Sequence, residues 1–278
     1  MIEIGIYNEL TILRTTSVGL YLGDDEGEDV LLPNKYCPDE YEIGDKLNVF
    51  VYLDYAERKV ATNIEPKIKL HEFALLKTTS VENVGAFMDW GLEKELMVPF
   101  KEQRQKMEQG RWYIVFLDID EKTDRLYATN KIEKRLQNDE LTIEQGDEVD
   151  LLVYTKTDLG YSMIINNQHK GLVFDNEVFK ELNIGDKLKG FVKEIRQDNK
   201  VDLVLSAVGY SNYNDSNSMM ILDKLNQNDG FIGVNDKSAP HEIYDEFGIS
   251  KKAFKKAVGA LYKNRDVSIE SKGIRLNK

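Results

Sequence analysis

The sequence predicts a mainly β chain: three small β-barrels in tandem, followed by an α+β module of three helices and a β-hairpin. Two glycine anchors recur three times at matching intervals, and the segments between them are short and rich in β-branched and aromatic residues, as strands are. Near residue 210 the apolar residues change from the period of strands to that of helices. We therefore expect four domains, at residues 1–65, 66–138, 139–210 and 216–278.

Each repeat contains one glycine inside an apolar run and a second glycine in a turn before a strand. The first anchor is Gly19, Gly85 and Gly160, and the second is Gly44, Gly110 and Gly185. Both anchors move by 66 residues from the first repeat to the second, and by 75 from the second to the third. An equal shift at both anchors indicates repetition of one structural unit.

Each repeat has room for five short strands. The clearest strand-like segments lie at residues 49–53, 113–117 and 190–195, each followed by a polar turn. Five strands in roughly 65 residues are typical of a small closed barrel such as the OB-fold. The glycine inside the strand pattern marks the sharp bend with which such a barrel turns a corner.

These repeats resemble the S1 RNA-binding domain. That family's pattern runs glycine-alanine-phenylalanine-valine, then a glycine-leucine-valine-histidine strand, a glycine-aspartate turn, two strands and a closing serine. Residues 84–100 and 171–206 match it best, and the similarity extends from residue 1 to about residue 210. The resemblance implies three S1-like OB barrels.

The C-terminal module is predicted to be a winged helix, because three helical segments are closed by a hairpin. A polar linker is expected at 211–218. The helices are expected at 219–228, at 240–247 with Ser238 as a cap before Pro240, and from 251 to about Asn264 with Ser250 as a cap. The two strands are expected at 267–270 and 273–276.

Residues 249–257, which read ISKKAFKKA, carry a second resemblance. Together with the three barrels they resemble the bacterial conserved virulence factor B family, whose architecture is S1-like repeats plus a winged helix. This resemblance spans essentially the whole chain. It implies an RNA-binding, post-transcriptional role.

Charge is distributed unevenly along the chain. The net charge of −12 argues at first sight against a nucleic-acid ligand, because phosphates need cations. However, residues 1–65 carry 5 basic and 14 acidic side chains, whereas residues 247–278 carry 9 basic and 2 acidic ones. The last module is therefore a basic cap on an acidic body. We expect the nearly neutral second barrel to bind RNA, and the acidic first barrel to contact protein or its neighbours.

Composition also favours one compartment. The sequence has no run of eighteen apolar residues, no signal-peptide pattern at its start and a single cysteine, Cys37, which cannot form an internal disulfide. We therefore expect a cytoplasmic protein that does not contact a membrane.

The S1 resemblance implies which residues stack on bases. In that family the aromatic positions precede the bend glycine, follow it by two residues, and end the next strand as a histidine. One aromatic residue per barrel occupies them here: Tyr21, Phe87 and Phe174. The histidine is absent, and the other positions hold Val18 and Pro33, Val84 and Pro99, and Leu159 and Ser162. Each barrel alone should therefore bind RNA weakly. The three barrels on one chain can still bind a single strand by avidity.

Further candidates come from neighbouring aromatic and basic residues. Trp90, Phe100 and Tyr161 could widen the platforms. The cations near the expected groove are Arg14, Lys35, Lys77, Lys101, Arg125 and Lys170. The candidates for phosphate contacts in the winged helix are Lys251, Lys252, Lys255, Lys256, Lys263, Arg265, Lys272 and Arg275. For each of these residues the alternative is a partly buried barrel aromatic or a solvated cation.

The sequence offers no pattern for catalysis. It has no glycine-rich nucleotide-binding loop, and His71, His169 and His241 are too dispersed to form a zinc site. We expect His71 and His169 at the surface or in turns, and the acidic residues at 118–124 in a hairpin turn. No cofactor, no metal and no enzymatic activity are expected.

Three functions are compatible with these patterns. The first is an RNA-binding regulator that holds single-stranded segments across the barrels and anchors phosphates on the winged helix. The second is an adaptor for a protein partner, such as a ribosomal or RNA-decay component, which the loss of most stacking aromatics favours. The third is a DNA-binding regulator that acts through the winged helix.

Overall fold

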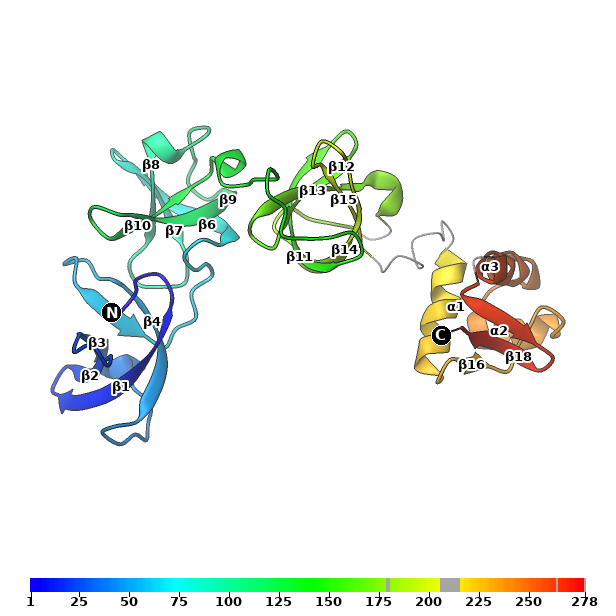
Figure 1. Cartoon of the computed structure of the whole chain (residues 1–278), viewed down its shortest axis with the longest axis horizontal. Helices are drawn as coiled ribbons and strands as arrows, with labels where there is room; N and C mark the ends of the chain where they lie inside the picture. Colours follow the sequence, from blue (N-terminus) through cyan, green and yellow to red (C-terminus); the bar gives the residue numbers. More distant parts are fainter. Residues whose placement is uncertain (179–180, 206–215, 264, 278) are drawn as a thin grey trace. The chain divides into compact units, whose positions relative to one another are not determined.

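The computed structural model describes residues 1–178, 181–205, 216–263 and 265–277, which form three β-strand repeats and a helical C-terminal module (Figure 1). The first repeat is a closed barrel whose strands are joined in the order β1-β2-β3-β5-β4. These strands are β1 (Tyr7–Thr16), β2 (Gly19–Gly23), β3 (Asp29–Pro33), β4 (Lys46–Leu53) and β5 (Lys59–Thr62).

The other two repeats have the same strand order. The second contains β6 (Phe73–Glu82), β7 (Gly85–Asp89), β8 (Leu96–Pro99), β9 (Trp112–Asp120) and β10 (Arg125–Thr129). Its ladder reads β10-β9-β6-β7-β8, which is the same order opened between β8 and β10. The third repeat closes again and contains β11 (Glu148–Thr157), β12 (Gly160–Ile165), β13 (His169–Phe174), β14 (Lys187–Ile195) and β15 (Val201–Val204).

A bend glycine separates the first two strands of every repeat. Gly19, Gly85 and Gly160 have φ angles of +151°, +158° and +152°, a region that residues with a Cβ atom disfavour. A Cβ would lie 2.0 Å from the Leu32 carbonyl oxygen at Gly19, and 2.4 Å from that of Val98 at Gly85. The first strand of each repeat also shifts register near this hairpin, and such a bulge bends the strand around the barrel.

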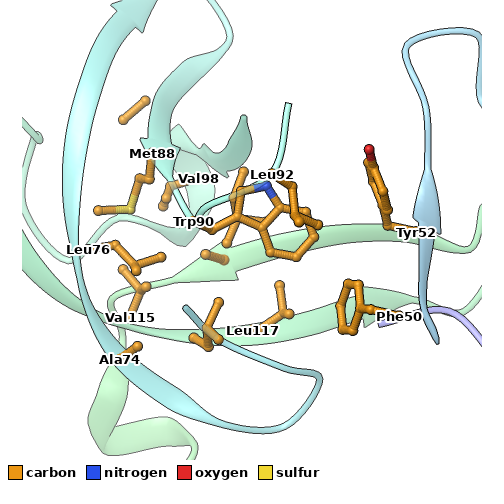
Figure 2. Close-up of a cluster of buried hydrophobic side chains, with 14 of the residues drawn as sticks. Phe50, Tyr52, Ala74, Leu76, Met88, Trp90, Leu92, Val98, Val115 and Leu117 are labelled. Atoms are coloured by element: carbon orange, nitrogen blue, oxygen red, sulfur yellow. The ribbon is translucent and has the colours of Figure 1, made fainter. Parts of the chain in front are cut away.

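One hydrophobic cluster joins the first two repeats, and the first repeat also has a separate core of its own. Figure 2 shows Trp90, which follows β7, beside Phe50 and Tyr52 of β4 and close to Leu117 of β9. Trp90 is only 3% exposed, and its ring centroid lies 6.0 Å from that of Phe50 and 6.1 Å from that of Tyr52, edge-on in both cases. Its Nε1 donates a hydrogen bond of 2.5 Å to the Lys94 carbonyl oxygen, which satisfies its polar group.

His169 lies inside the third repeat, so the prediction that places it at the surface is wrong. Its side chain is fully buried on β13. Its Nδ1 lies 2.7 Å from the Gln137 carbonyl oxygen, and its Nε2 lies 2.9 Å from the Thr142 hydroxyl. The segment that leads into the third repeat therefore covers the ring and supplies its hydrogen bonds. His71 is exposed in a turn, as expected.

The C-terminal module is a winged helix with one strand more than predicted. Its elements are α1 (Ser216–Gln227), β16 (Phe231–Ile232), α2 (Pro240–Phe247), α3 (Lys251–Lys263), β17 (Val267–Glu270) and β18 (Gly273–Leu276), with the sheet order β16-β18-β17. Ser250 caps α3, since its hydroxyl accepts the Ala253 N–H at 3.2 Å. Ser238 does not cap α2, because its hydroxyl accepts the Asn235 N–H instead.

The predicted fold class, mainly β with S1-like barrels and a winged helix, is confirmed by this arrangement. The predicted linker residues 211–215, the closing Ser206 and the helix end at Asn264 lie outside the described residues, while 216–218 begin α1. The four domain boundaries stay a prediction. Within the described ranges, no helix is long and apolar enough to cross a membrane.

Candidate nucleic-acid interface

In the first barrel, a cation covers the stacking position. Tyr21 is half-buried on β2, and the guanidinium carbon of Arg14, its cross-strand neighbour on β1, lies 3.9 Å from the ring centroid. An ion pair of 2.7 Å to the Asp29 carboxylate holds Arg14 in this place. Because cation–π contacts use the face of the ring, a base would have to displace Arg14 in order to stack on Tyr21.

In the second barrel, the equivalent position has a small neighbour. Phe87 on β7 is paired with Ser80 on β6, and no cation lies over its ring among the residues described. Val84, before the bend glycine, is 50% exposed, and Phe100, after β8, is 45% exposed. Phe87 is half-buried, but its ring is not covered by a cation of the described residues, and further exposed apolar side chains flank it.

The same outer face of the second barrel carries Trp112, which sequence reasoning overlooked. Trp112 is 55% exposed at the start of β9. The ladder pairs it with Lys77 on β6, and pairs Lys77 with Asp89 on β7, two residues from Phe87. Because alternate residues of a strand share a face, Trp112, Lys77 and Phe87 lie on one side of the sheet. The only sequence signal was an aromatic residue two positions after the turn Gly110.

In the third barrel, the aromatic residues are again covered. Ser162, at the position of Phe87, is buried and provides no platform. The Lys156 ammonium lies 3.9 Å from the ring centroid of Tyr161, and the Arg196 guanidinium carbon lies 5.7 Å from that of Phe174. Tyr161 and Phe174 remain half-buried. Both rings thus lie beneath a cation, as the ring of Tyr21 does.

Four of the six predicted barrel cations are in ion pairs, and among the described residues Lys77 and Lys101 are not. Arg125 pairs with Glu57 at 2.9 Å, and the two oxygens of Glu133 accept from the Lys170 ammonium at 2.9 and 3.0 Å. Exposed pairs of this kind contribute at most about 1 kcal/mol, so phosphates can compete for the cations. Lys101 is exposed beside Phe100, and the described residues include no ion-pair partner for it.

The pKa of Glu57 follows from this pairing. Desolvation alone would raise it, but hydrogen bonds and charge from Lys94 and Arg125 outweigh this effect and hold the pKa of Glu57 below its ordinary value of 4.5. Glu57 lies in the first repeat, between β4 and β5, whereas both cations belong to the second. The carboxylate therefore links the two repeats at neutral pH.

Most of the predicted phosphate contacts of the winged helix have no carboxylate partner. Six of the eight are exposed and make no ion pair with any described residue: Lys252, Lys255, Lys256, Lys263, Arg265 and Lys272. Lys251 is half-buried and donates to the Ser238 carbonyl oxygen at 2.7 Å. Arg275 pairs with Glu270 at 2.6 Å and covers the Phe231 ring. The positive surface is thus centred on α3 and its neighbouring turns.

Two protein-family models match the chain. The S1 domain matches residues 4–63, and the CvfB-like winged helix domain matches residues 219–276. The protein named conserved virulence factor B from Staphylococcus epidermidis is 27% identical over 248 residues, which cover 86% of this chain and 83% of that protein. The predicted resemblance to the conserved virulence factor B family is confirmed.

Other relatives extend this likeness to conserved virulence factor B. The uncharacterized protein YitL of Bacillus subtilis is 28% identical over 282 residues, covering 94% of this chain and 90% of that protein. A crystal structure described as a multidomain protein with nucleic acid binding domains, from Streptococcus pneumoniae, is 24% identical, covers 99% of this chain and 98% of that chain, and has a TM-score of 0.42. S1 and winged helix domains both support nucleic-acid binding as the class of function.

In this virulence factor B-like chain, the prediction that Trp90 is a nucleic-acid-binding residue is wrong. Trp90 cannot serve as a stacking platform, because its ring is packed against Phe50 and Tyr52 in the core that the first two repeats share. In sequence it looks like a surface aromatic after a strand. The exposed aromatic residue on the outer face is Trp112 instead.

Proposed function

We propose that the chain is an RNA-binding regulator that acts in the cytoplasm without chemistry of its own. The second barrel stacks single-stranded bases, and the winged helix anchors the phosphates. The observation that carries this proposal is that no described cation covers the ring of Phe87, which has Ser80 as its cross-strand neighbour where Tyr21 has Arg14. A stacked base contributes about 1–3 kcal/mol, so one open platform needs help from electrostatics.

The electrostatic part is assigned to the six exposed members of the predicted winged-helix set that have no ion-pair partner in the described ranges. Cations that contact phosphates release counterions, so binding should weaken steeply as salt is raised. Joining a stacking barrel and a phosphate anchor in one chain gives an affinity that neither module reaches alone. Such binding would alter the translation, folding or decay of a transcript without a catalytic group.

The experiment is a titration of fluorescent single-stranded RNA, duplex RNA and duplex DNA with the full-length protein at several salt concentrations. Phe87→Ala should weaken binding of single-stranded RNA about tenfold. Tyr21→Ala is the matched control, since it removes the equivalent ring from a platform that Arg14 covers, and it should change affinity little. Equal losses in the two variants would refute the assignment to the second barrel.

Two observations favour the adaptor function. The first barrel is strongly acidic, and its aromatic platform is covered by the Arg14–Asp29 pair. If the full-length protein binds none of the three nucleic acids at low salt, this protein-binding function becomes the better one. A preference for duplex DNA that is independent of Phe87 would instead favour a DNA-binding regulator acting through the winged helix.

A further inference from the structure

Gly259 occupies the middle of the exposed face of α3. At about 100° per residue, Lys252, Lys255, Lys256, Tyr262 and Lys263 all fall within about 60° of Gly259 around the helix axis. These five side chains are exposed, and Tyr262 is 57% exposed. The buried residues of α3 lie on the opposite side: Phe254, Ala257, Val258 and Leu261. The centre of the cationic face is thus bare main chain.

The fold itself gives no reason for a glycine at this position. Glycine is the poorest helix former after proline, because it loses most backbone entropy. A Cβ at Gly259 would meet no heavy atom within 4 Å, and its φ angle is not positive. Gly248 is a contrasting case, since it ends α2 at a φ of +67°, where glycine is favoured. At Gly259 the missing side chain provides only free space outside the helix.

We propose that the phosphodiester backbone of a nucleic acid crosses α3 at Gly259, in contact with the helix main chain. Lys252 and Lys263 lie towards the two ends of the contact, Lys255 and Lys256 flank it, and Tyr262 lies at its edge. A polyanion fits this surface, because the described residues place no carboxylate against its four lysines. The inference rests on the proposed phosphate anchor and adds the residue at which the strand comes closest.

The test uses the full-length protein and measures separately the effect of filling the space at Gly259 and the effect of removing a positive charge. Gly259→Leu fills the gap and Gly259→Ala fills part of it, and neither changes the charge. The leucine variant should weaken binding of single-stranded RNA about tenfold and the alanine variant about threefold. The slope of log affinity against log salt concentration should stay the same, because the number of phosphates that the cations neutralise does not change. Both variants should melt at the same or a higher temperature, since each residue favours a helix more than glycine does.

Two control variants complete the design. Ala260→Leu places the same side chain at an exposed position about 100° further round the helix, and it should bind as the parent does. Lys255→Gln removes one charge and should lower the salt slope by about 0.7. The same series measured with duplex RNA and duplex DNA shows which backbone uses the surface.

The outcomes are distinct. If Gly259→Ala and Gly259→Leu bind like the parent while Lys255→Gln binds more weakly, the close approach at Gly259 is refuted and the phosphate anchor stands. If Lys255→Gln also binds like the parent, the anchor itself fails. Should the leucine disturb folding, the alanine variant decides, and parental affinity in that variant overturns the inference.

Discussion

The bend glycines show how little room a single residue can have in these barrels. At Gly85, φ is +158° and a Cβ would lie 2.4 Å from the Val98 carbonyl oxygen. We expect Gly85→Ala to lower the free energy of unfolding by more than about 2 kcal/mol, because the hairpin must open to admit the methyl group. Urea unfolding followed by circular dichroism measures this loss.

Gly110 is the matched control for Gly85→Ala. It has a φ angle of +81°, but a Cβ there would meet nothing within 4 Å. Gly110→Ala should therefore cost only the backbone strain, about 1 kcal/mol. A cost at Gly110 equal to that at Gly85 would show that the approach of Val98 is not the cause.

The two tryptophans offer a second comparison at the scale of residues. The chain contains only Trp90, which is buried, and Trp112, which is 55% exposed. Trp90→Ala should lower the free energy of unfolding by about 3–5 kcal/mol, because it leaves a cavity in the cluster that joins two repeats. Trp112→Ala should leave stability nearly unchanged.

Fluorescence distinguishes the roles of the same two residues. If bases stack near Phe87 and Trp112, bound RNA should quench the emission of the parent protein. Trp112→Phe, in which only Trp90 emits, should show little quenching while it still binds. Strong quenching in Trp112→Phe would contradict the assignment of the outer face as the RNA-binding face.

At the scale of elements, ion pairs of Glu57 connect the turn between β4 and β5 to the second repeat. Its carboxylate lies 3.2 Å from the Lys94 ammonium and 2.9 Å from the Arg125 guanidinium. Because the pKa of Glu57 is below its ordinary value of 4.5 in the folded protein, this contribution to stability is complete above that value. It is lost as the pH falls through the lowered pKa.

We therefore expect the parent protein to lose more stability than Glu57→Gln as the pH is lowered from 6 towards about 3. Thermal unfolding across this range, with the variant as the reference, isolates the contribution of this one carboxylate. The difference should be small, since the side chain is 41% exposed. Parallel curves for the two proteins would show that the link contributes nothing.

The elements that follow local rules could be predicted from the sequence, and the long-range contacts could not. The bend glycines, the Ser250 cap and the helical face of α3 depend on residues close in sequence. The covering of Tyr21 depends on Arg14 across a bulged ladder, and the burial of Trp90 depends on Phe50 from another repeat. His169 is buried by a segment about thirty residues away. These contacts join residues far apart in the sequence, and neither the composition nor the spacing of apolar residues predicts them.

At the scale of the whole molecule, the separation of charge predicts a steep dependence on salt. The net charge is −12, yet α3 and its surroundings carry the unpaired cations of the described winged helix. Replacing Lys252, Lys255, Lys256 and Lys263 by glutamine should lower the salt slope by up to about 3, at about 0.7 for each phosphate that is no longer neutralised. Filter binding over a range of about 50 to 300 mM salt measures it, and an unchanged slope would place the RNA elsewhere.

The core around Trp90 also bears on how the repeats can be rearranged. A module can be copied, swapped or deleted freely only while it exposes no large apolar surface without its neighbour. The first barrel has an interior of its own, but Phe50 and Tyr52 are covered by a ring that the second one supplies, so a chain cut between them would leave both side chains against water. We therefore expect the first barrel to be less soluble alone than when it is joined to the second.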